Sequence, residues 1–379
     1  MRMSSRSADH LVIGGGLAGS TVGIRLAAAG RAVTLLEREP NAHHKVCGEF
    51  LSREAVAYLE QLGVDAISLG AQTIGSVRLT ARSQVVETKL PFTALSVSRC
   101  VLDEALIKRA AESGCTVERG AFVEGLATRD GSWTAQLRGG QSWTSATVFL
   151  ASGKHDVRGI ERGAGQHRDL VGFKMHWRLA PAQTEALRDS MDLFLFAGGY
   201  GGLSLVEGNA ANFCLLVQRA VLRKAGGWKQ LLDKIQSENA HIAKRLSNAH
   251  ALWDRPLAIS SIPYGYIHAG GAGLWCVGDQ AAVIPSFTGD GMSIALHSGS
   301  LAAQMYLAGA TSDGYHSRLD THLSRSMKLA TGLSRVMLSR LGRRLAPIGV
   351  RVLPKAMNWI AQATRIPERA LAETGVGGH

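Results

Sequence analysis

The sequence predicts an α/β fold with three parts: a domain built on a parallel sheet, an antiparallel sheet inserted into it, and a helical C-terminal region. Three observations predict this arrangement. A strand, a glycine-rich turn, a helix and a second strand follow one another over residues 11–37. Residues 74–95 and 170–218 alternate apolar and polar side chains, as antiparallel strands with one buried face do. Most of the last sixty residues carry apolar side chains at helical spacing.

The composition is that of an ordinary globular chain. Of the 379 residues, 46% are hydrophobic and 19% are charged, which suffices for two modest domains or one large domain with an insertion. The five cysteines are widely spaced and form no C-x-x-C pair, so we expect neither a disulfide framework nor a zinc site. With a polar N-terminus and no long apolar run, the sequence predicts a cytoplasmic protein, with peripheral membrane association left open.

The first fifty residues predict a dinucleotide site. Gly14, Gly16 and Gly19 form a G-x-G-x-x-G turn between a short apolar strand and a helix. The first glycine permits the tight turn, the second lets a pyrophosphate approach the backbone, and the third lets the helix pack on the strand. Leu17 and Ala18 stand at the helix N-terminus, where backbone amides attract phosphate.

The second strand of this unit, residues 33–36, supports the same prediction. It ends in Glu37, whose carboxylate can accept hydrogen bonds from both ribose hydroxyls, and Arg38 follows directly. Because strand, turn, helix, second strand and acid occur in the required order, we expect a bound dinucleotide. This unit alone leaves FAD and NAD open.

A later segment, "LWCVGDQAAVIPSFTGDGMSIALHSGSLAA" (274–303), favours FAD. An apolar strand ends at Asp279, which can hydrogen-bond a polyol, and Pro285 lies in the following loop. Amides at the next helix start, over Gly289, Gly291 and Met292, can meet the electron-rich edge of a flavin. The segment resembles the second FAD motif of the p-hydroxybenzoate hydroxylase and geranylgeranyl reductase superfamily. This resemblance implies an FAD cofactor in a Rossmann-like domain of the glutathione-reductase type.

Residues 146–159, "ATVFLASGKHDVRG", resemble the A-D-G-x-x-S-x-x-R segment of that superfamily. Ala151, Gly153 and Arg158 match, whereas Ser152 replaces the aspartate and Asp156 replaces the serine. In the family that aspartate helps to place the flavin and the reduced nicotinamide. The electron donor therefore stays open between NADPH or NADH acting directly and the same donors acting through a separate flavin reductase.

The loop after the second strand contains "KVCGEFLS" (45–52), which resembles the K-x-C-G-G segment of geranylgeranyl reductases. Lys45, Cys47 and Gly48 match, and Glu49 departs. The resemblance implies that Lys45 and Gly48 lie at the cofactor and that Cys47 is an active-site thiol. Glu49 is a candidate acid or base at the cavity edge. The alternative for Cys47 is a buried, inert cysteine.

Two further residues are candidates by resemblance. Arg99 starts a helix over 97–114 and looks like the family's arginine that reaches the cofactor; otherwise it is a surface arginine. Tyr200 is the residue retained from the P-x-x-Y-x-W-x-F-P motif of geranylgeranyl reductases, and it either lines the cavity or belongs to the core. Because the rest of that motif is missing, the sequence does not imply an isoprenoid substrate.

These anchors divide the chain into an FAD-binding domain (1–73, 96–168 and 266–323), a substrate domain (74–95 and 169–265) and a C-terminal helical region (324–379). The net charge of +12 concentrates in that last region, where residues 325–355 hold eight basic residues and no acidic ones. They are Arg325, Lys328, Arg335, Arg340, Arg343, Arg344, Arg351 and Lys355. A basic amphipathic helix can lie on an anionic membrane or bind an acidic carrier protein, or it can pack on the core with its charged face in water. We expect no nucleic-acid partner, because the charge is local and no aromatic residues are interleaved with it.

The sequence thus predicts an FAD-dependent oxidoreductase, foremost a monooxygenase that hydroxylates or epoxidises an apolar or aromatic small molecule. A secondary metabolite, a polyketide or a lipid-like compound would fit. A dry cavity and correct placement are what the protein adds to flavin chemistry, so few catalytic side chains are expected. The alternative is a flavin-dependent ene-reductase, which Cys47 favours. A halogenase or a non-catalytic flavin-binding module is expected less, and the adjacent His43 and His44 predict a loop rather than a metal pair.

Overall fold

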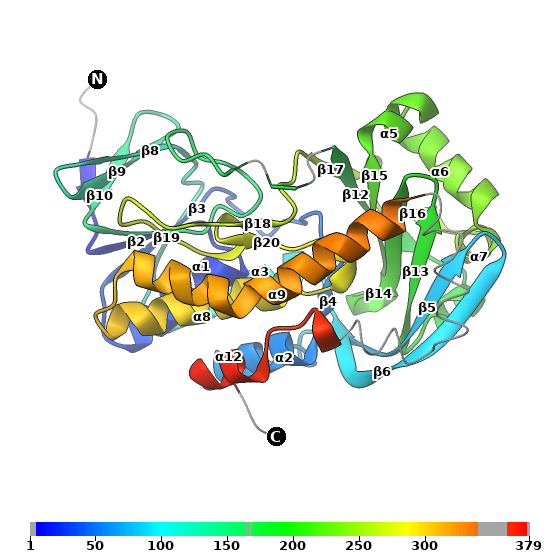
Figure 1. The fold of residues 1–379 in the computed structure, drawn as a ribbon, viewed down its shortest axis with the longest axis horizontal. Helices are drawn as coiled ribbons and strands as arrows, with labels where there is room; N and C mark the ends of the chain where they lie inside the picture. Colours follow the sequence, from blue (N-terminus) through cyan, green and yellow to red (C-terminus); the bar gives the residue numbers. More distant parts are fainter. Residues whose placement is uncertain (1–4, 164, 167–168, 340–361, 377–379) are drawn as a thin grey trace.

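The computed structural model describes residues 5–163, 165–166, 169–339 and 362–376. Two large sheets stand side by side, and the long helix α9 (Ser312–Leu338) runs along both of them (Figure 1). It contacts strand β19 of the first sheet and strand β14 of the second. The predicted α/β fold, with a parallel nucleotide-binding sheet and an antiparallel sheet, is confirmed.

The first sheet is parallel throughout, in the order β19-β11-β2-β3-β7. Its strands are β19 (Trp275–Cys276), β11 (Thr147–Leu150), β2 (His10–Ile13), β3 (Val33–Glu37) and β7 (Thr116–Arg119). Helix α1 (Leu17–Ala28) packs against α3 (Arg99–Glu112) and α8 (Gly291–Leu307). A smaller sheet beside it pairs β1 (Ser5–Ser7), β10 (Ser142–Ser145), β9 (Ser132–Leu137) and β8 (Val123–Arg129). The carboxyl ends of the parallel strands therefore converge at one edge, where such sheets bind ligands.

The second sheet is antiparallel except where β13 pairs with β5. In order, its strands are β16 (His250–Ala251), β12 (Leu170–Arg178), β15 (Ala211–Gln218), β14 (Gly199–Leu205), β13 (Ser190–Phe196), β5 (Gln72–Ala81), β6 (Gln84–Ser96) and β4 (Phe50–Leu51). Strand β17 (Leu257–Ser260) also pairs with β12, and β18 (Tyr266–Ile267) pairs with β20 (Ala282–Val283). The sheet has one face on its own core and the other toward a cavity.

Helices complete the two cores. On the large sheet lie α4 (Pro181–Glu185), α5 (Arg219–Ala225), α6 (Trp228–Glu238) and α7 (Ala240–Arg245). Helix α2 (Arg53–Gln61) packs against α8 and against β4 and β6 of the large sheet, and the last described helix is α12 (Glu368–Glu373). Three short 3-10 turns are η1 (Glu207–Asn209), η2 (Gly278–Gln280) and η3 (Ser286–Thr288). Ser52 caps α2 by accepting a hydrogen bond from the amide of Ala55. None of the described helices has both the length and the apolar character that crossing a membrane requires.

Candidate functional site

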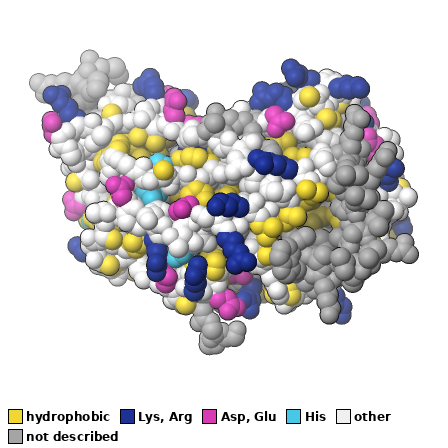
Figure 2. All heavy atoms as spheres, in the orientation of Figure 1, with side chains coloured by type: hydrophobic (Ala, Val, Ile, Leu, Met, Phe, Trp, Pro, Cys, Tyr) yellow, Lys and Arg dark blue, Asp and Glu magenta, His cyan; other side chains and the backbone are white. Residues whose placement is uncertain are grey.

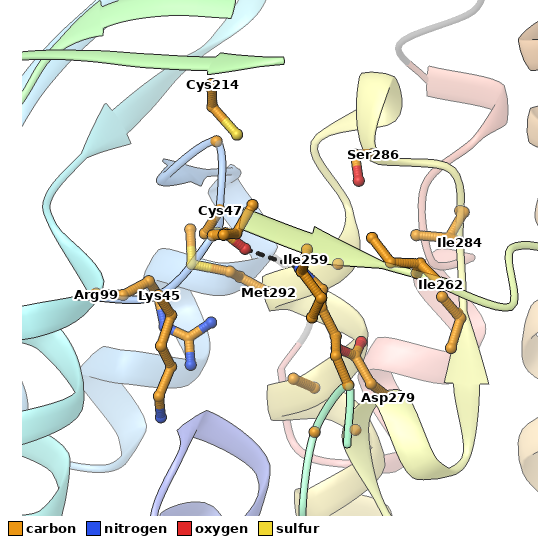
Figure 3. A pocket seen from close by; sticks show the side chains of 18 of the residues that line it. Lys45, Cys47, Arg99, Cys214, Ile259, Ile262, Asp279, Ile284, Ser286 and Met292 are labelled. Atoms are coloured by element: carbon orange, nitrogen blue, oxygen red, sulfur yellow. Dashed lines mark hydrogen bonds between the residues drawn. The ribbon is translucent and has the colours of Figure 1, made fainter. Parts of the chain in front are cut away.

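A cavity of about 800 Å3 lies between the two sheets. Its lining includes every predicted site residue except Gly19 and Pro285, which stand next to it in the chain without facing it. Figure 3 shows how the predicted residues meet: Arg99 and Lys45 point the same way, Cys47 faces Cys214, and Asp279 comes from the opposite wall. The structure thus brings together predicted site residues that are up to 278 residues apart in the chain, from Gly14 to Met292.

The glycines of the first turn have different reasons to be glycine. Gly14 has φ +108°, and a Cβ there would lie 2.3 Å from the Ala151 carbonyl oxygen. A Cβ on Gly19 would lie 1.9 Å from the Gly14 carbonyl oxygen, so helix and strand could not pack. A Cβ on Gly16 would meet nothing closer than Arg99 Nη2 at 3.5 Å. The protein itself therefore leaves room at Gly16, and that room opens on the cavity.

The groups around Gly16 suit a pyrophosphate. Gly16 is the N-cap of α1, and no side chain caps the helix there. Arg99 binds Asp103 through Nε at 2.7 Å and Nη2 at 2.9 Å, and Lys45 Nζ reaches the same carboxylate at 2.8 Å. Burial alone would raise the pKa of Asp103, but Arg99 and Lys45 lower it, so it is ionised. Two cations and one anion leave one positive charge beside the helix N-terminus, where an anion is stabilised.

Glu37 is placed for a ribose. Its side chain is 4% exposed, lines the cavity at the end of β3, and accepts the amides of Gly15 at 2.7 Å and Glu39 at 2.9 Å. Arg38 also lines the cavity and forms an ion pair with Glu39 at 3.0 Å. The carboxylate is therefore fixed in direction by backbone donors before any ligand is present.

The second predicted segment forms the facing wall. Asp279 lies in η2 and lines the cavity, and Pro285 is the N-cap of η3. Gly289 adopts φ +75°, which lets the chain turn into α8, and a Cβ on Gly291 would meet nothing within 4 Å. Met292 lines the cavity from the first turn of α8, whose N-cap has no side-chain hydrogen bond. These residues fit the polyol chain and the pyrimidine edge of FAD.

Sequence reasoning missed Arg162. Its side chain is 3% exposed and donates to the Asp156 carboxylate at 2.6 Å, to the Asp279 carbonyl at 3.0 Å and to the Lys154 carbonyl at 2.7 Å. Arg162 therefore ties the loop that holds Ser152 to the turn that holds Asp279. No motif in the sequence marks it, because its partners lie in two segments that only the fold brings together.

The loop with Cys47 is pinned from three directions. Lys154 Nζ donates to the Val46 carbonyl at 2.8 Å, and Asn212 Nδ2 donates to the Cys47 carbonyl at 3.2 Å. The Glu49 amide points at Cys47 Sγ at 3.4 Å. Cys47 is half-buried and lines the cavity opposite Cys214, and burial raises the pKa of Cys214 to about 12. The loop thus presents one thiol to the cavity from a fixed backbone.

Glu49 forms the most buried charge cluster beside the cavity. Its carboxylate accepts the Arg99 amide at 2.7 Å, a close contact from Lys174 Nζ, and His176 Nε2 at 3.0 Å. Burial alone would raise the pKa of Glu49, but Lys174 and then His176 lower it, so the group is an anion at neutral pH. Glu49 also adopts φ +59°, a strained conformation outside glycine. Sequence reasoning placed Glu49 at the cavity edge, but its partners Lys174 and His176 were missed.

His44 extends this cluster. Its ring stacks edge-on against His176, and His176 stacks on Trp253. Ligand atoms of His44, Glu49 and His176 lie within 4.8 Å of one another, which is close enough for a metal. The Lys174 ammonium already supplies the positive charge at the Glu49 carboxylate, so this carboxylate is neutralised without a metal ion, whereas His44 Nδ1 has no hydrogen-bond partner among the described residues.

The wall above the flavin segments is apolar. Tyr200 is 4% exposed and packs edge-on against Phe287, and burial raises the pKa of its phenol, which stays protonated. Apolar side chains from the large sheet, from β20 and the loops beside it, and from α9 form the rest of the wall, among them Val77, Leu79, Leu193, Leu195, Leu216, Ile259, Ile262, Val283, Ile284, Leu333, Val336 and Met337. Chemically, the arrangement can hold a dinucleotide on its polar side and an apolar molecule on the other.

Residues 7–149 match the family model of an FAD binding domain. The chain therefore carries an FAD binding domain and is an FAD-dependent oxidoreductase. The predicted FAD cofactor is confirmed by this match, and the glycine turn, Glu37 and Asp279 fit it.

Similar proteins agree with this assignment. Menaquinone reductase of Mycolicibacterium smegmatis is 26% identical over 91% of this chain and 88% of its own length. Menaquinone reductase of Mycobacterium tuberculosis is also 26% identical, over 79% of this chain and 76% of its own. A geranylgeranyl bacteriochlorophyll reductase-like protein of Thermoplasma acidophilum has the same fold, with a TM-score of 0.75, 17% identity, and coverage of 98% of this chain and 96% of that one. The myxobacterial halogenase CndH shares the fold equally, at TM-score 0.75 and 17% identity, covering 97% of this chain and 96% of that one.

Proposed function

We propose that this FAD-dependent oxidoreductase is a reductase that saturates a carbon–carbon double bond in an apolar, lipid-like substrate such as an isoprenoid or a lipid quinone. The apolar half of the cavity carries the proposal. Two full-length relatives of this chain bear the name menaquinone reductase, which supports reduction as the reaction and a lipid quinone as the substrate class.

The cavity wall is suited to bind an alkyl or prenyl chain without orienting polar groups. Leu195, Leu216 and Ile262 are each less than 5% exposed and face the cavity from the large sheet and the segment beyond it. Burial of a ligand's apolar surface contributes roughly 25 cal/mol per Å2, so an extended chain gains affinity along its length. Such a wall selects for length and apolar character rather than for hydrogen-bonding pattern.

The cavity opens toward α9. Leu333, Val336 and Met337 line it from this helix, and Val336 is 54% exposed. The same helix carries Arg325, Lys328 and Arg335, and Figure 2 shows Lys and Arg side chains across the middle of this face beside hydrophobic ones. We infer that the substrate enters here from an anionic membrane surface, which attracts basic residues. Five of the eight basic residues in the predicted amphipathic helix, Arg340 to Lys355, lie outside the described residues.

Bound FAD would supply the hydride. Cys47 is then the candidate proton donor, because its thiol lies on the pinned loop at the cavity, between the flavin segments and the apolar wall. Glu49 does not suit that role, since its carboxylate is ionised and occupied by three donors. We assign Glu49 a positioning role: it holds the loop that presents Cys47. Tyr200, a protonated phenol in the wall, would orient the substrate.

The electron donor is proposed to be NADPH or NADH, directly or through a separate flavin reductase. Ser152, which stands at the family's aspartate, donates its hydroxyl to the His155 carbonyl at 2.8 Å within its own loop. Its hydroxyl is therefore engaged within its own loop. Anaerobic mixing with each nucleotide, followed by flavin absorbance, tests the direct route: bleaching within the turnover time supports it, and bleaching only after a flavin reductase is added supports the relayed one.

Product mass tests the reaction. The enzyme is incubated with NADPH and a flavin reductase as the source of electrons and a menaquinone with an unsaturated side chain, in detergent, under labelled oxygen or under argon. Quinols formed by simple reduction are reoxidised in air before mass analysis. We expect a gain of two hydrogens that survives reoxidation and does not need oxygen. A product that gains one labelled oxygen atom would instead establish the monooxygenase that the sequence favoured, for which a dry cavity serves equally.

A further inference from the structure

We propose that His268, Cys276 and His316 form a binding site for a transition-metal ion of the zinc class, separate from the flavin cavity. One ring nitrogen of each histidine and Cys276 Sγ lie within 4.8 Å of one another. His268 directly follows β18, Cys276 ends β19, and His316 lies in the first turns of α9. None of the three lines the flavin cavity.

Two buried ring nitrogens at this site have no hydrogen-bond partner among the described residues. His316 is 1% exposed, and its Nδ1 is one of them. His268 Nε2 is the other, and the two rings lie 4.5 Å apart between centroids. A buried unsatisfied nitrogen costs about 1–3 kcal/mol, so two on neighbouring rings indicate a ligand that both would share.

The opposite nitrogens have the partners that metal-binding histidines use. His316 Nε2 lies 3.1 Å from the Leu274 carbonyl and 3.4 Å from the Cys276 amide nitrogen, and the tautomer that donates to the nearer carbonyl leaves the lone pair on Nδ1. His268 Nδ1 lies 2.7 Å from the Tyr266 hydroxyl, and donation there leaves the lone pair on Nε2. Such second contacts fix the tautomer and the ring orientation of histidine ligands. In both residues the nitrogen without a partner is therefore the one that can bind a metal.

The surroundings keep these ligands available. Burial lowers the pKa of His316 to about 4 and also lowers that of His268, so both imidazoles are neutral. Burial raises the pKa of Cys276 to about 12, and an ion would displace the thiol proton on binding. The nearby charges are Arg162 and Asp313, whose Oδ1 accepts the Gly271 amide at 2.7 Å.

The donor set points to a zinc-class ion. Two imidazoles and one thiolate are soft or borderline ligands, which favour Zn2+ over Mg2+ or Ca2+. Three protein ligands leave a fourth tetrahedral position for water. Metal–ligand bonds of about 2.0–2.3 Å place tetrahedral ligand atoms about 3.5 Å apart. Side-chain rotations that bring the three ligand atoms about 1 Å closer to one another would therefore complete the site.

The positions of Cys276 and His316 in the fold determine which elements a bound ion would connect. Cys276 precedes Asp279 by three residues, at the strand end that leads into the flavin-binding turn. His316 belongs to α9, which also lines the cavity. A bound ion would therefore tie the flavin-binding turn to the helix at the cavity mouth. The ligands are 8 and 40 residues apart along the chain, a spacing that no zinc motif has.

The test uses the FAD-loaded enzyme, stripped with a chelator and titrated with Zn2+ against a chromophoric chelator, with metal content measured by elemental analysis. We expect one equivalent of Zn2+ per chain and a rise in melting temperature. Cys276→Ser and His316→Gln should no longer bind Zn2+ at this site. Cys115→Ser, which removes a buried thiol elsewhere, should bind it as the unaltered enzyme does. Tyr266→Phe should lower the Zn2+ affinity at least about tenfold. Co2+ provides a second readout, because its tetrahedral d–d bands lie at longer wavelength than flavin absorption.

No stoichiometric Zn2+ in the unaltered enzyme would overturn the proposal. Equal Zn2+ binding by Cys276→Ser and Cys115→Ser would overturn it as well, because the ion would then sit elsewhere. If Cys276→Ser or His316→Gln fails to fold, the test rests on Tyr266→Phe and on the Co2+ spectrum of the unaltered enzyme. Weak bands typical of octahedral Co2+, or an unchanged Zn2+ affinity in Tyr266→Phe, would refute the site.

Discussion

Gly16 and Gly19 stand three residues apart in the same turn, yet a side chain at each would meet different surroundings. At Gly19 the first added carbon collides with the protein's own backbone, whereas at Gly16 it enters the cavity. Gly19 is therefore needed for the packing of helix on strand, whereas Gly16 leaves room for a ligand. The same division holds at Cys47 and Glu49, where one side chain faces the cavity and its neighbour holds the loop in place.

Gly16→Ala should fold normally and lose FAD. Because a Cβ there meets no protein atom within 3.5 Å, the melting temperature of the FAD-free variant should match that of the FAD-free parent. FAD affinity, measured by flavin fluorescence, should fall at least about tenfold, or about 1.4 kcal/mol. Gly19→Ala is the matched control and should lose about 1–3 kcal/mol of unfolding free energy through overpacking. Unchanged FAD affinity in Gly16→Ala would show that the pyrophosphate does not approach this residue.

Cys47→Ser should reduce turnover about 10²-fold or more while FAD affinity changes little, because a hydroxyl is a poorer proton donor than a thiol. Steady-state rates and flavin titration separate the two effects. Cys100→Ser, a half-buried cysteine that does not line the cavity, is the control and should retain activity. Full activity in Cys47→Ser would instead indicate that Cys47 is a buried, inert cysteine, which is the alternative that the sequence leaves open.

At the scale of elements, α9 and the loop after β3 connect the two sheets. The apolar stripe of α9 is buried at Met327 and Ala330 and then becomes the cavity wall from Leu333 onward. Over its described length, the apolar stripe of α9 therefore packs on the core and then lines the cavity. For this part of the helix, the alternative that the stripe packs on the protein's own core is the one that holds. The loop reaches the large sheet through the contact of Glu49 with Lys174 of β12.

Glu49→Gln should destabilise the fold by about 3 kcal/mol, because Lys174 would keep a buried charge without its partner. Lys174→Met should cost a similar amount, and the double variant should cost clearly less than the sum. Urea unfolding measures all three. Glu87→Gln, which breaks a half-exposed ion pair with Arg78, is the control and should cost less than about 1 kcal/mol. Additive costs for Glu49 and Lys174 would mean that the pair is not coupled.

Val336→Asp should raise KM for an apolar substrate several-fold, since it places a charge at the cavity mouth on α9. Val85→Asp is the matched control: it is another exposed valine, 46% against 54%, and it does not line the cavity. Both variants should fold, because neither side chain is buried. Steady-state kinetics with a detergent-dispersed quinone would make the comparison, and equal KM values in the two variants would place the substrate entrance elsewhere.

Over the whole molecule, several ionisable side chains are buried. His297 hydrogen-bonds Tyr58 at 2.6 Å and His322 at 3.0 Å, and burial lowers its pKa to about 3. His322 Nε2 in turn lies 3.2 Å from the Glu373 carboxylate, and burial lowers the pKa of His322 too. The pKa values of Glu49 and Asp103 are lowered as well, by the cations beside them despite burial. These two histidines and two carboxylates hold fewer protons in the folded chain than in the unfolded one.

Stability should therefore fall as the pH drops from 7 toward 4. Unfolded histidines bind a proton near pH 6.5, whereas His297 stays neutral until about pH 3, so protons favour the unfolded chain throughout this window. The carboxylates of Glu49 and Asp103 extend the loss below pH 4.5. Melting temperature across a pH series measures the slope, which His297→Gln should flatten. A level profile from pH 7 to 5 would contradict this description of the interior.

The sequence predicted those parts of the site that local chemistry determines. Gly14, Gly16, Glu37 and Asp279 follow from strand ends and turns, where the backbone fixes what a residue can meet. Lys174, Arg162 and the paired His268 and His316 could not be predicted in this way, because their partners lie on other elements. On an alternating strand Lys174 reads as solvent-facing, and only the approach of the Glu49 loop makes its burial possible. The domain boundaries and the catalytic roles stay predictions.

Anaerobic reoxidation of the flavin tests the central claim, that the apolar cavity brings an unsaturated lipid to reduced FAD. The enzyme is photoreduced under argon and mixed with a menaquinone whose ring is already reduced to the quinol, so that only the side chain can accept electrons. We expect oxidised flavin absorbance to return without oxygen, with a product heavier by two hydrogens, and more slowly in Val336→Asp. A flavin that stays reduced until oxygen is admitted, and then yields an oxygenated product, would contradict it.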